Sequence, residues 1–120
     1  MDLTPLLVKL FPQTSATFSG RSGFEVNGLP SGSVPQSCDI IAHAQAPGAL
    51  SSRRAYYLVR VDGALVFLRI CSAMPGSGYD EFAVIRSVEL SAQAQPEYEA
   101  RCVADIASLC GVSPDDVRVG

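Results

Sequence analysis

The chain has 120 residues, of which 48% are hydrophobic and 18% charged, and its formal net charge is −3. This length predicts a single domain over residues 1–120 with a sizeable core, and the composition excludes an intrinsically disordered chain. The acidic balance gives no overall attraction to nucleic acid or to anionic membranes, so binding of either would need a local basic patch.

The sequence carries no sign of export or of a membrane span. Its start, MDLTPLLVKLFP, lacks the basic region and the small-residue cleavage site of a signal peptide. Arg60, Arg69 and Arg86 interrupt the apolar runs, so we expect no transmembrane helix. None of the four cysteines shows C-x-x-C spacing. We therefore expect free thiols and a cytoplasmic protein.

A short helix over about 4–11 is predicted at the N-terminus, because Thr4 suits an N-cap, Pro5 the first turn, and Pro12 a stop. The following stretch to residue 36 is rich in Gly, Ser, Thr and Pro and predicts two short strands. Residues 38–45 then alternate, which predicts a half-buried strand. One face of that strand would carry Cys38, Ile40, Ala42 and Ala44.

The segment AYYLVRVDGALVFLRI, residues 55–70, predicts a β-hairpin around a type I′ turn at Asp62-Gly63. The turn sets the register, and a slip by one residue would turn Arg60 into the core. One face would pair Val61 with Ala64, Val59 with Val66, and Tyr57 with Leu68; the other would pair Tyr56 with Arg69, Leu58 with Phe67, and Arg60 with Leu65.

The remaining chain predicts a loop over 71–81, a strand, and the clearest helix of the sequence over about 96–110. In the strand, Phe82, Val84, Val88 and Leu90 would share one face. Pro96 fits the first turn of the helix, and Gly111 fits the position just beyond its end. We expect the helix stripe to cover the hairpin face that carries Val59 and Val66. That stripe comprises Tyr98, Cys102, Ile106 and Leu109, with Val103 and Cys110 alongside.

The elements together predict an α+β fold. A four- to five-stranded, largely antiparallel sheet would carry the long C-terminal helix on one face, with the short N-terminal helix added. Val117 and Val119 would supply a short edge strand.

The sequence offers no strong catalytic, metal or cofactor motif. His43 is the only histidine, and on a strand its Cα would lie roughly 13 Å from that of Asp39. A thiol-dependent enzyme using Cys71 or Cys38 with His43 would need these residues to converge through folding. The cysteines and the histidine are too scattered for the closely spaced ligand pairs of structural zinc sites. We predict no catalytic, metal or cofactor-binding residues.

The second hairpin face combines arginines with apolar and aromatic side chains, a composition enriched at protein interfaces. We expect a non-enzymatic module, such as an inhibitor, adaptor or immunity-type protein, that docks on a larger protein. Small bacterial and phage counter-defence proteins share this size class. The alternatives are the thiol enzyme, a single-stranded nucleic-acid binder on the same face, a homodimer, and coverage of this face by the N-terminal helix. The expected partner-binding residues are Arg54, Tyr56, Arg60, Phe67, Arg69, Met74 and Tyr79.

Overall fold

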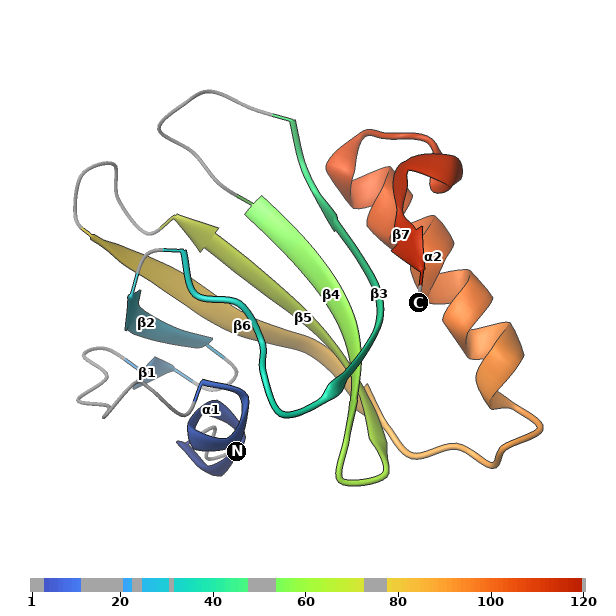
Figure 1. The fold of residues 1–120 in the computed structure, drawn as a ribbon, viewed down its shortest axis with the longest axis horizontal. Helices are drawn as coiled ribbons and strands as arrows, with labels where there is room; N and C mark the ends of the chain where they lie inside the picture. The colour runs from blue at the N-terminus through green and yellow to red at the C-terminus, as the bar shows by residue number, and fades with distance from the viewer. Residues whose placement is uncertain are drawn as a thin grey trace.

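The computed structural model of the chain describes residues 4–11, 21–22, 25–30, 32–47, 54–72 and 78–119. Its strands form one antiparallel sheet in the order β1-β2-β6-β5-β4-β3-β7. The helix α2 packs against this sheet, which confirms the α+β fold with its long C-terminal helix (Figure 1). Within the described ranges, no helix has the length and apolar character needed to cross a membrane. The elements are α1 (Thr4–Leu10), β1 (Arg21–Ser22), β2 (Glu25–Pro30), β3 (Asp39–Gln45), β4 (Arg54–Val61), β5 (Ala64–Ser72), β6 (Tyr79–Val88), α2 (Gln95–Cys110), the 3-10 turn η1 (Pro114–Asp116) and β7 (Arg118–Val119).

Helix α2 begins and ends where the sequence predicts. Pro96 lies in the first turn, where its missing N–H costs no helical hydrogen bond. Gly111 follows the last residue with a φ of 69°, the left-handed conformation that glycine adopts without strain. Its backbone N–H donates to the carbonyls of Ala107 and Ser108, so the helix end is satisfied.

The central hairpin of β4 and β5 has the predicted register. Asp62 and Gly63 have φ values of 52° and 78°, the two positive values that a type I′ turn requires. All six predicted pairs are present, from Val61 opposite Ala64 to Tyr56 opposite Arg69. The strands run further than expected, because β5 continues to Ser72 and β6 already begins at Tyr79.

A bulge in β6 changes which face its side chains occupy. Leu68 pairs with Val84 but Phe67 pairs with Arg86, so Ile85 is an extra residue in β6. The alternation of side chains therefore shifts by one at this point. The prediction that Phe82, Val84, Val88 and Leu90 share one face is therefore wrong. Phe82 and Val84 pack on one side of the sheet, whereas Val88 and Leu90 pack on the other.

Strand β3 carries a similar bulge. Ile40 pairs with Val59 but Ala42 pairs with Leu58, so Ile41 is the extra residue. The predicted common face of this strand is therefore split as well. Cys38 and Ile40 pack with the residues around Val59, whereas Ala42 and Ala44 pack beneath α2.

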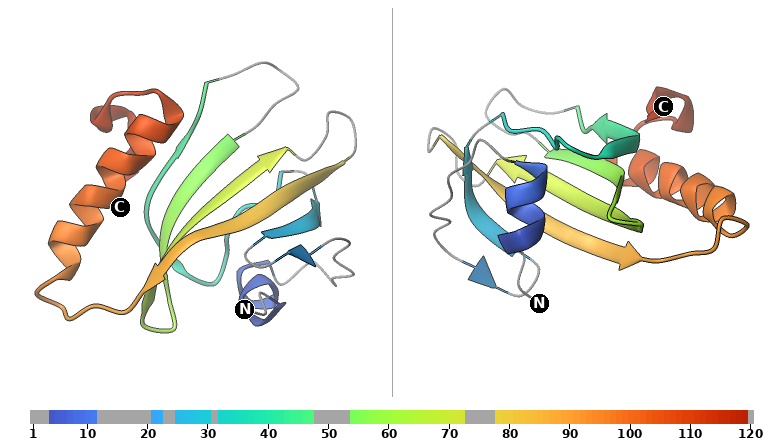
Figure 2. Two further views of the ribbon diagram at one scale, coloured as in Figure 1. Left: turned by 180° about the vertical axis from the view of Figure 1, so that it is seen from behind. Right: turned by 60° about the horizontal axis from the view of Figure 1, so that its bottom comes forward.

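The sheet is buried on both faces by different parts of the chain. We call the two clusters the α1-side core and the α2-side core, after the helix that lies on each face (Figure 2). The α1-side core includes Leu10, Phe11, Leu29, Val59, Val66, Leu68 and Phe82. The α2-side core includes Tyr56, Leu58, Leu65, Phe67, Cys102, Ile106 and Cys110.

Helix α2 thus covers the opposite hairpin face from the predicted one. Val59 and Phe67 are both 0% exposed, because each face of the hairpin is apolar enough to form a core. Leu109, expected in the buried stripe, is 45% exposed instead. The expectation that α2 packs on Val59 and Val66 is therefore wrong, while its stripe through Cys102 and Ile106 is buried as predicted.

Candidate functional site

The aromatic members of the expected partner-binding set lie beneath α2. Tyr56 is 5% exposed and Phe67 is 0% exposed, and their rings meet edge to face with centroids 6.3 Å apart. Neither side chain offers a surface to a partner in this structure. Because both side chains are buried, the prediction that Tyr56 and Phe67 contact a partner is corrected. A base-stacking platform would also need exposed aromatic faces, and these two rings do not provide them.

Arg86, which sequence reasoning did not single out, closes the edge of this buried cluster. Its guanidinium carbon lies 5.0 Å from the centre of the Phe67 ring. Its Nη2 donates to Oδ2 of Asp105 on α2 over 2.6 Å, and this hydrogen bond raises the pKa of the arginine. The bulge at Ile85 turns Arg86 to this side of the sheet. Arg86 therefore ties β6 to α2 across the ring that it covers.

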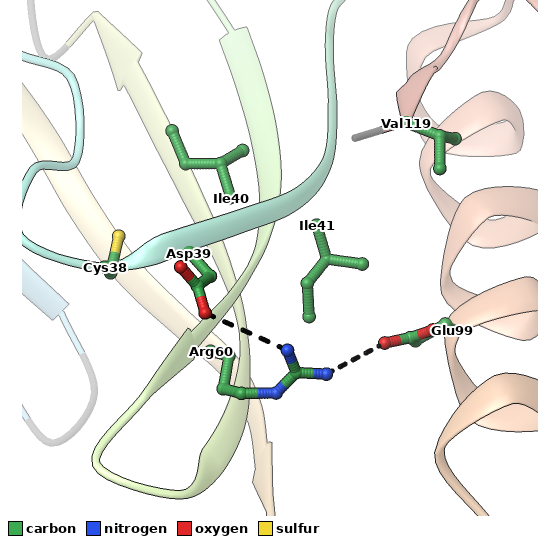
Figure 3. A pocket seen from close by; sticks show the side chains of 7 residues that line it. All are labelled: Cys38, Asp39, Ile40, Ile41, Arg60, Glu99 and Val119. Atoms are coloured by element: carbon green, nitrogen blue, oxygen red, sulfur yellow. Dashed lines mark hydrogen bonds and ion pairs between the residues drawn. The ribbon is translucent and has the colours of Figure 1, made fainter.

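Arg60 lies at the turn end of the hairpin and binds residues of the same chain. Its Nη2 donates to Gln95 Oε1 over 3.1 Å and to Glu99 Oε1 over 3.2 Å, so it holds the first turns of α2 against the sheet. Nη1 lies 3.9 Å from Asp39 Oδ2. The side chain stays 38% exposed at the rim of a hollow between β3 and α2 (Figure 3).

The other end of the hairpin carries a group of half-exposed polar side chains that we call the arginine end. It consists of Arg54, Arg69, Cys71 and Glu81. Arg54 pairs with Cys71, and Cys71 with Glu81, so these three share one row across β4, β5 and β6. Arg69 lies in the next row, opposite Tyr56. All four point to the α2 side of the sheet.

Helix α2 leaves the arginine end open, because it lies mainly over β3 and β4 (Figure 1). Arg54 is exposed, and Arg69, Cys71 and Glu81 are partly exposed. Met74 and the side chain of Tyr79, both expected at a partner interface, lie outside the described residues. Of the predicted set, Arg54, Arg60 and Arg69 therefore keep accessible side chains, and two of these, Arg54 and Arg69, lie together at the arginine end.

Cys71 donates to Glu81 Oε2 across 3.5 Å. Burial raises the pKa of this thiol, and the Glu81 carboxylate raises it further, whereas Arg69 opposes the shift. A raised pKa reduces the thiolate fraction at neutral pH, and the thiolate is the nucleophilic form. The environment of Cys71 is thus unlike that of an activated catalytic cysteine.

His43 does not meet either candidate thiol. It stacks on Tyr57, with ring centroids 5.5 Å apart and an interplanar angle of 8°. Tyr57 faces the α1-side core, whereas Cys71 is on the opposite face of the sheet. Cys38 is on the His43 side, but five residues earlier along the chain, which is about 16 Å on an extended strand. The described residues therefore do not form the pair that a thiol enzyme would need.

The lowered pKa of His43 has two causes, first its partial burial and second the nearby charge of Arg118. Among the side chains that the structure describes, no three His, Cys, Asp or Glu residues converge as metal ligands.

Comparison of the chain with protein-family models, with curated proteins and with solved structures finds no significant match. The geometry of the described residues therefore carries the functional inference.

Proposed function

We propose that the protein is a non-enzymatic binding module, of the inhibitor, adaptor or immunity type, that docks on a larger protein through the arginine end. The observation that supports this proposal is the position of α2. The helix buries the aromatic part of the mixed hairpin face and leaves Arg54 and Arg69 at an accessible edge of the same face.

The charge of the arginine end sets the chemistry of the partner. Arg54 and Arg69 lie on the same face of neighbouring strands and Glu81 lies in the row of Arg54, whereas the whole chain carries a net charge of −3. Two guanidinium groups therefore lie together at this end of an acidic chain. Arginine donates in a planar fork that matches carboxylates, so an acidic surface on the partner fits best.

The same geometry favours a protein partner over single-stranded nucleic acid. Base stacking needs aromatic faces in the open, and Tyr56 and Phe67 are both buried. We also propose a cytoplasmic location, because the four cysteines are free and a reducing compartment keeps them so.

The test is capture of the partner from the native host by the tagged full chain, compared with the double variant Arg54→Glu, Arg69→Glu. We expect the double variant to lose the captured protein while its circular dichroism spectrum and melting temperature stay near wild type. A matched control is Arg101→Glu, Arg118→Glu, which makes the same charge change at two exposed positions elsewhere.

Equal loss in both double variants would show that total charge, and not the arginine end, governs binding. Retention of the partner by a folded Arg54→Glu, Arg69→Glu protein would refute the proposed surface. Because Arg69 is partly buried, Arg54→Glu with Arg69→Met provides a second variant that keeps an apolar side chain at this position.

A further inference from the structure

A second hollow lies at the edge of the sheet formed by β3 and β7, on the side of the α1-side core. Its volume is about 400 Å³, and its polar lining comprises His43, Gln45, Tyr57, Asp116 and Arg118. Tyr57 belongs to the α1-side core, and His43 lies opposite it on β3. Arg118 of β7 lies opposite His43 in turn. The strand pairing therefore places Tyr57, His43 and Arg118 in one row on the same face. We call this cavity the His43 hollow.

The middle of this row is held in one orientation before any ligand binds. The imidazole of His43 stacks on the ring of Tyr57, and Tyr57 itself is buried in the sheet. His43 remains partly exposed on its other sides. A side chain that is already ordered loses little further conformational entropy when a ligand contacts it, so this histidine is a preorganised part of the hollow.

The positive charges of the His43 hollow are not neutralised by a neighbouring carboxylate. Among the residues that the structure describes, neither Arg118 nor Asp116 forms an ion pair. Burial lowers the pKa of His43 and the charge of Arg118 lowers it further, while no carboxylate among the described side chains counteracts the shift. An anion between these two side chains supplies the missing opposite charge.

The rest of the lining limits the kind of anion. Asp116 lines the same hollow and repels a second negative charge, so a singly charged ligand fits better than a phosphate dianion. The planar fork of Arg118 matches the two oxygens of a carboxylate. Val34 and Val112 add apolar surface to the lining, which a short aliphatic chain can contact.

We infer that the His43 hollow binds a small aliphatic monocarboxylate, with the carboxylate between Arg118 and His43 and the aliphatic chain against the apolar lining. The guanidinium donates to the carboxylate oxygens, and the imidazole donates a further hydrogen bond from its ring N–H. The titratable and charged groups that line the hollow are His43, Tyr57, Asp116 and Arg118. The arginine end lies on the opposite face of the sheet, so neither proposal depends on the other.

The probe is sodium isobutyrate, titrated at constant ionic strength into the ¹⁵N-labelled full chain and followed by NMR. We expect saturable shifts in the amide signals of residues 43–45 and 116–118. Isobutyramide, a neutral molecule of the same shape, should bind about tenfold more weakly, because hydrogen bonds to a charged group are stronger. The pKa of His43, followed through its ring protons, should rise when isobutyrate is added, since the anion stabilises the protonated imidazole. Binding should therefore tighten as the pH is lowered from about 7.5 to about 6, where the carboxylate stays ionised.

Two matched pairs of variants at exposed positions test the two charges of the hollow. Arg118→Gln should weaken isobutyrate binding at least about tenfold, whereas Arg101→Gln, on α2, should leave it unchanged. Asp116→Asn should tighten binding by about two- to fivefold through loss of a like charge, whereas Asp115→Asn should have no effect.

The inference is overturned if no saturable shifts occur, if the shifts map to the arginine end, or if the two members of either pair change binding equally. Equal binding of isobutyramide would show a purely apolar contact and would also overturn it. Tighter binding of inorganic phosphate would reassign the hollow to a more highly charged anion. Tighter binding of N-acetylglycylvaline would identify the carboxylate as that of a peptide C-terminus, and either result would overturn the small-acid assignment.

Discussion

The replacement Phe67→Ala tests the assignment of α2 to its face of the sheet. Phe67 is fully buried between Leu58 of β4, the α2 side chains and the guanidinium of Arg86. Truncation of a buried phenylalanine removes its transfer free energy and leaves a cavity, which costs about 3–5 kcal/mol. Arg86 would also lose the ring beneath it, a contact worth about 0.5–1 kcal/mol at a partly exposed site.

The measurement is urea denaturation of the wild type and the variant, followed by circular dichroism. With a denaturant slope of about 2 kcal/mol per molar, the midpoint should fall by roughly 2 M. A domain of this size has a free energy of unfolding of about 5–15 kcal/mol, so the variant should fold but with a small margin. The control is Leu109→Ala, on the exposed side of α2, which should change the free energy of unfolding by less than about 0.5 kcal/mol.

Similar small losses in both variants would refute the assignment, because Phe67 would then lie on an open face. That result would return Phe67 to the partner interface that its composition suggested.

The remaining predictions concern the turn, the histidine and one cysteine. Gly63→Ala should lower the free energy of unfolding by about 1–2 kcal/mol in urea denaturation, because Gly63 has a φ of 78°. His43 has a folded-state pKa below its ordinary 6.5, so the unfolded chain binds the proton first as pH falls. Stability should therefore decrease as pH drops through 6.5 toward the folded pKa, and the urea midpoint of His43→Gln should lack this component. Cys71 should react slowly with iodoacetamide at neutral pH, since burial and Glu81 raise its pKa; alkylation at the rate of a free thiol would contradict this account.

The hairpin could be predicted because the residues that determine its register lie next to each other in the sequence. Asp62-Gly63 selects one turn type, and that turn fixes every pair of the two strands. The same holds for the limits of α2, where Pro96 and Gly111 act within one turn of the helix.

The side on which α2 packs could not be predicted in this way. Both faces of the hairpin are apolar, and Arg60 and Arg69 suggested that one of them meets solvent. The long stem of an arginine can cross an apolar edge and keep its charged end accessible, so the presence of Arg60 did not exclude a helix above it. Local patterns do not say which distant segment will cover a face.

The bulges limited the prediction of the site. A single extra residue such as Ile85 leaves no clear trace in an alternating strand, yet it moves every later side chain to the other face. Arg86 was missed for this reason. An arginine in β6 and an aspartate on α2 become recognisable as a pair only once the shifted register is known.

The burial of the hairpin on both faces has a consequence for the chain before it folds. Strands that are apolar on both sides associate readily with identical strands when they are exposed. Such strands can pair through their backbones and pack either apolar face against another sheet with water excluded. Release of α2 alone would expose Leu58, Leu65 and Phe67 together. Arg60 and Arg69 interrupt this run, one in each strand, and stacked copies would place their like charges next to one another. These two arginines therefore oppose aggregation of the nascent or unfolded chain, whatever they bind in the folded one.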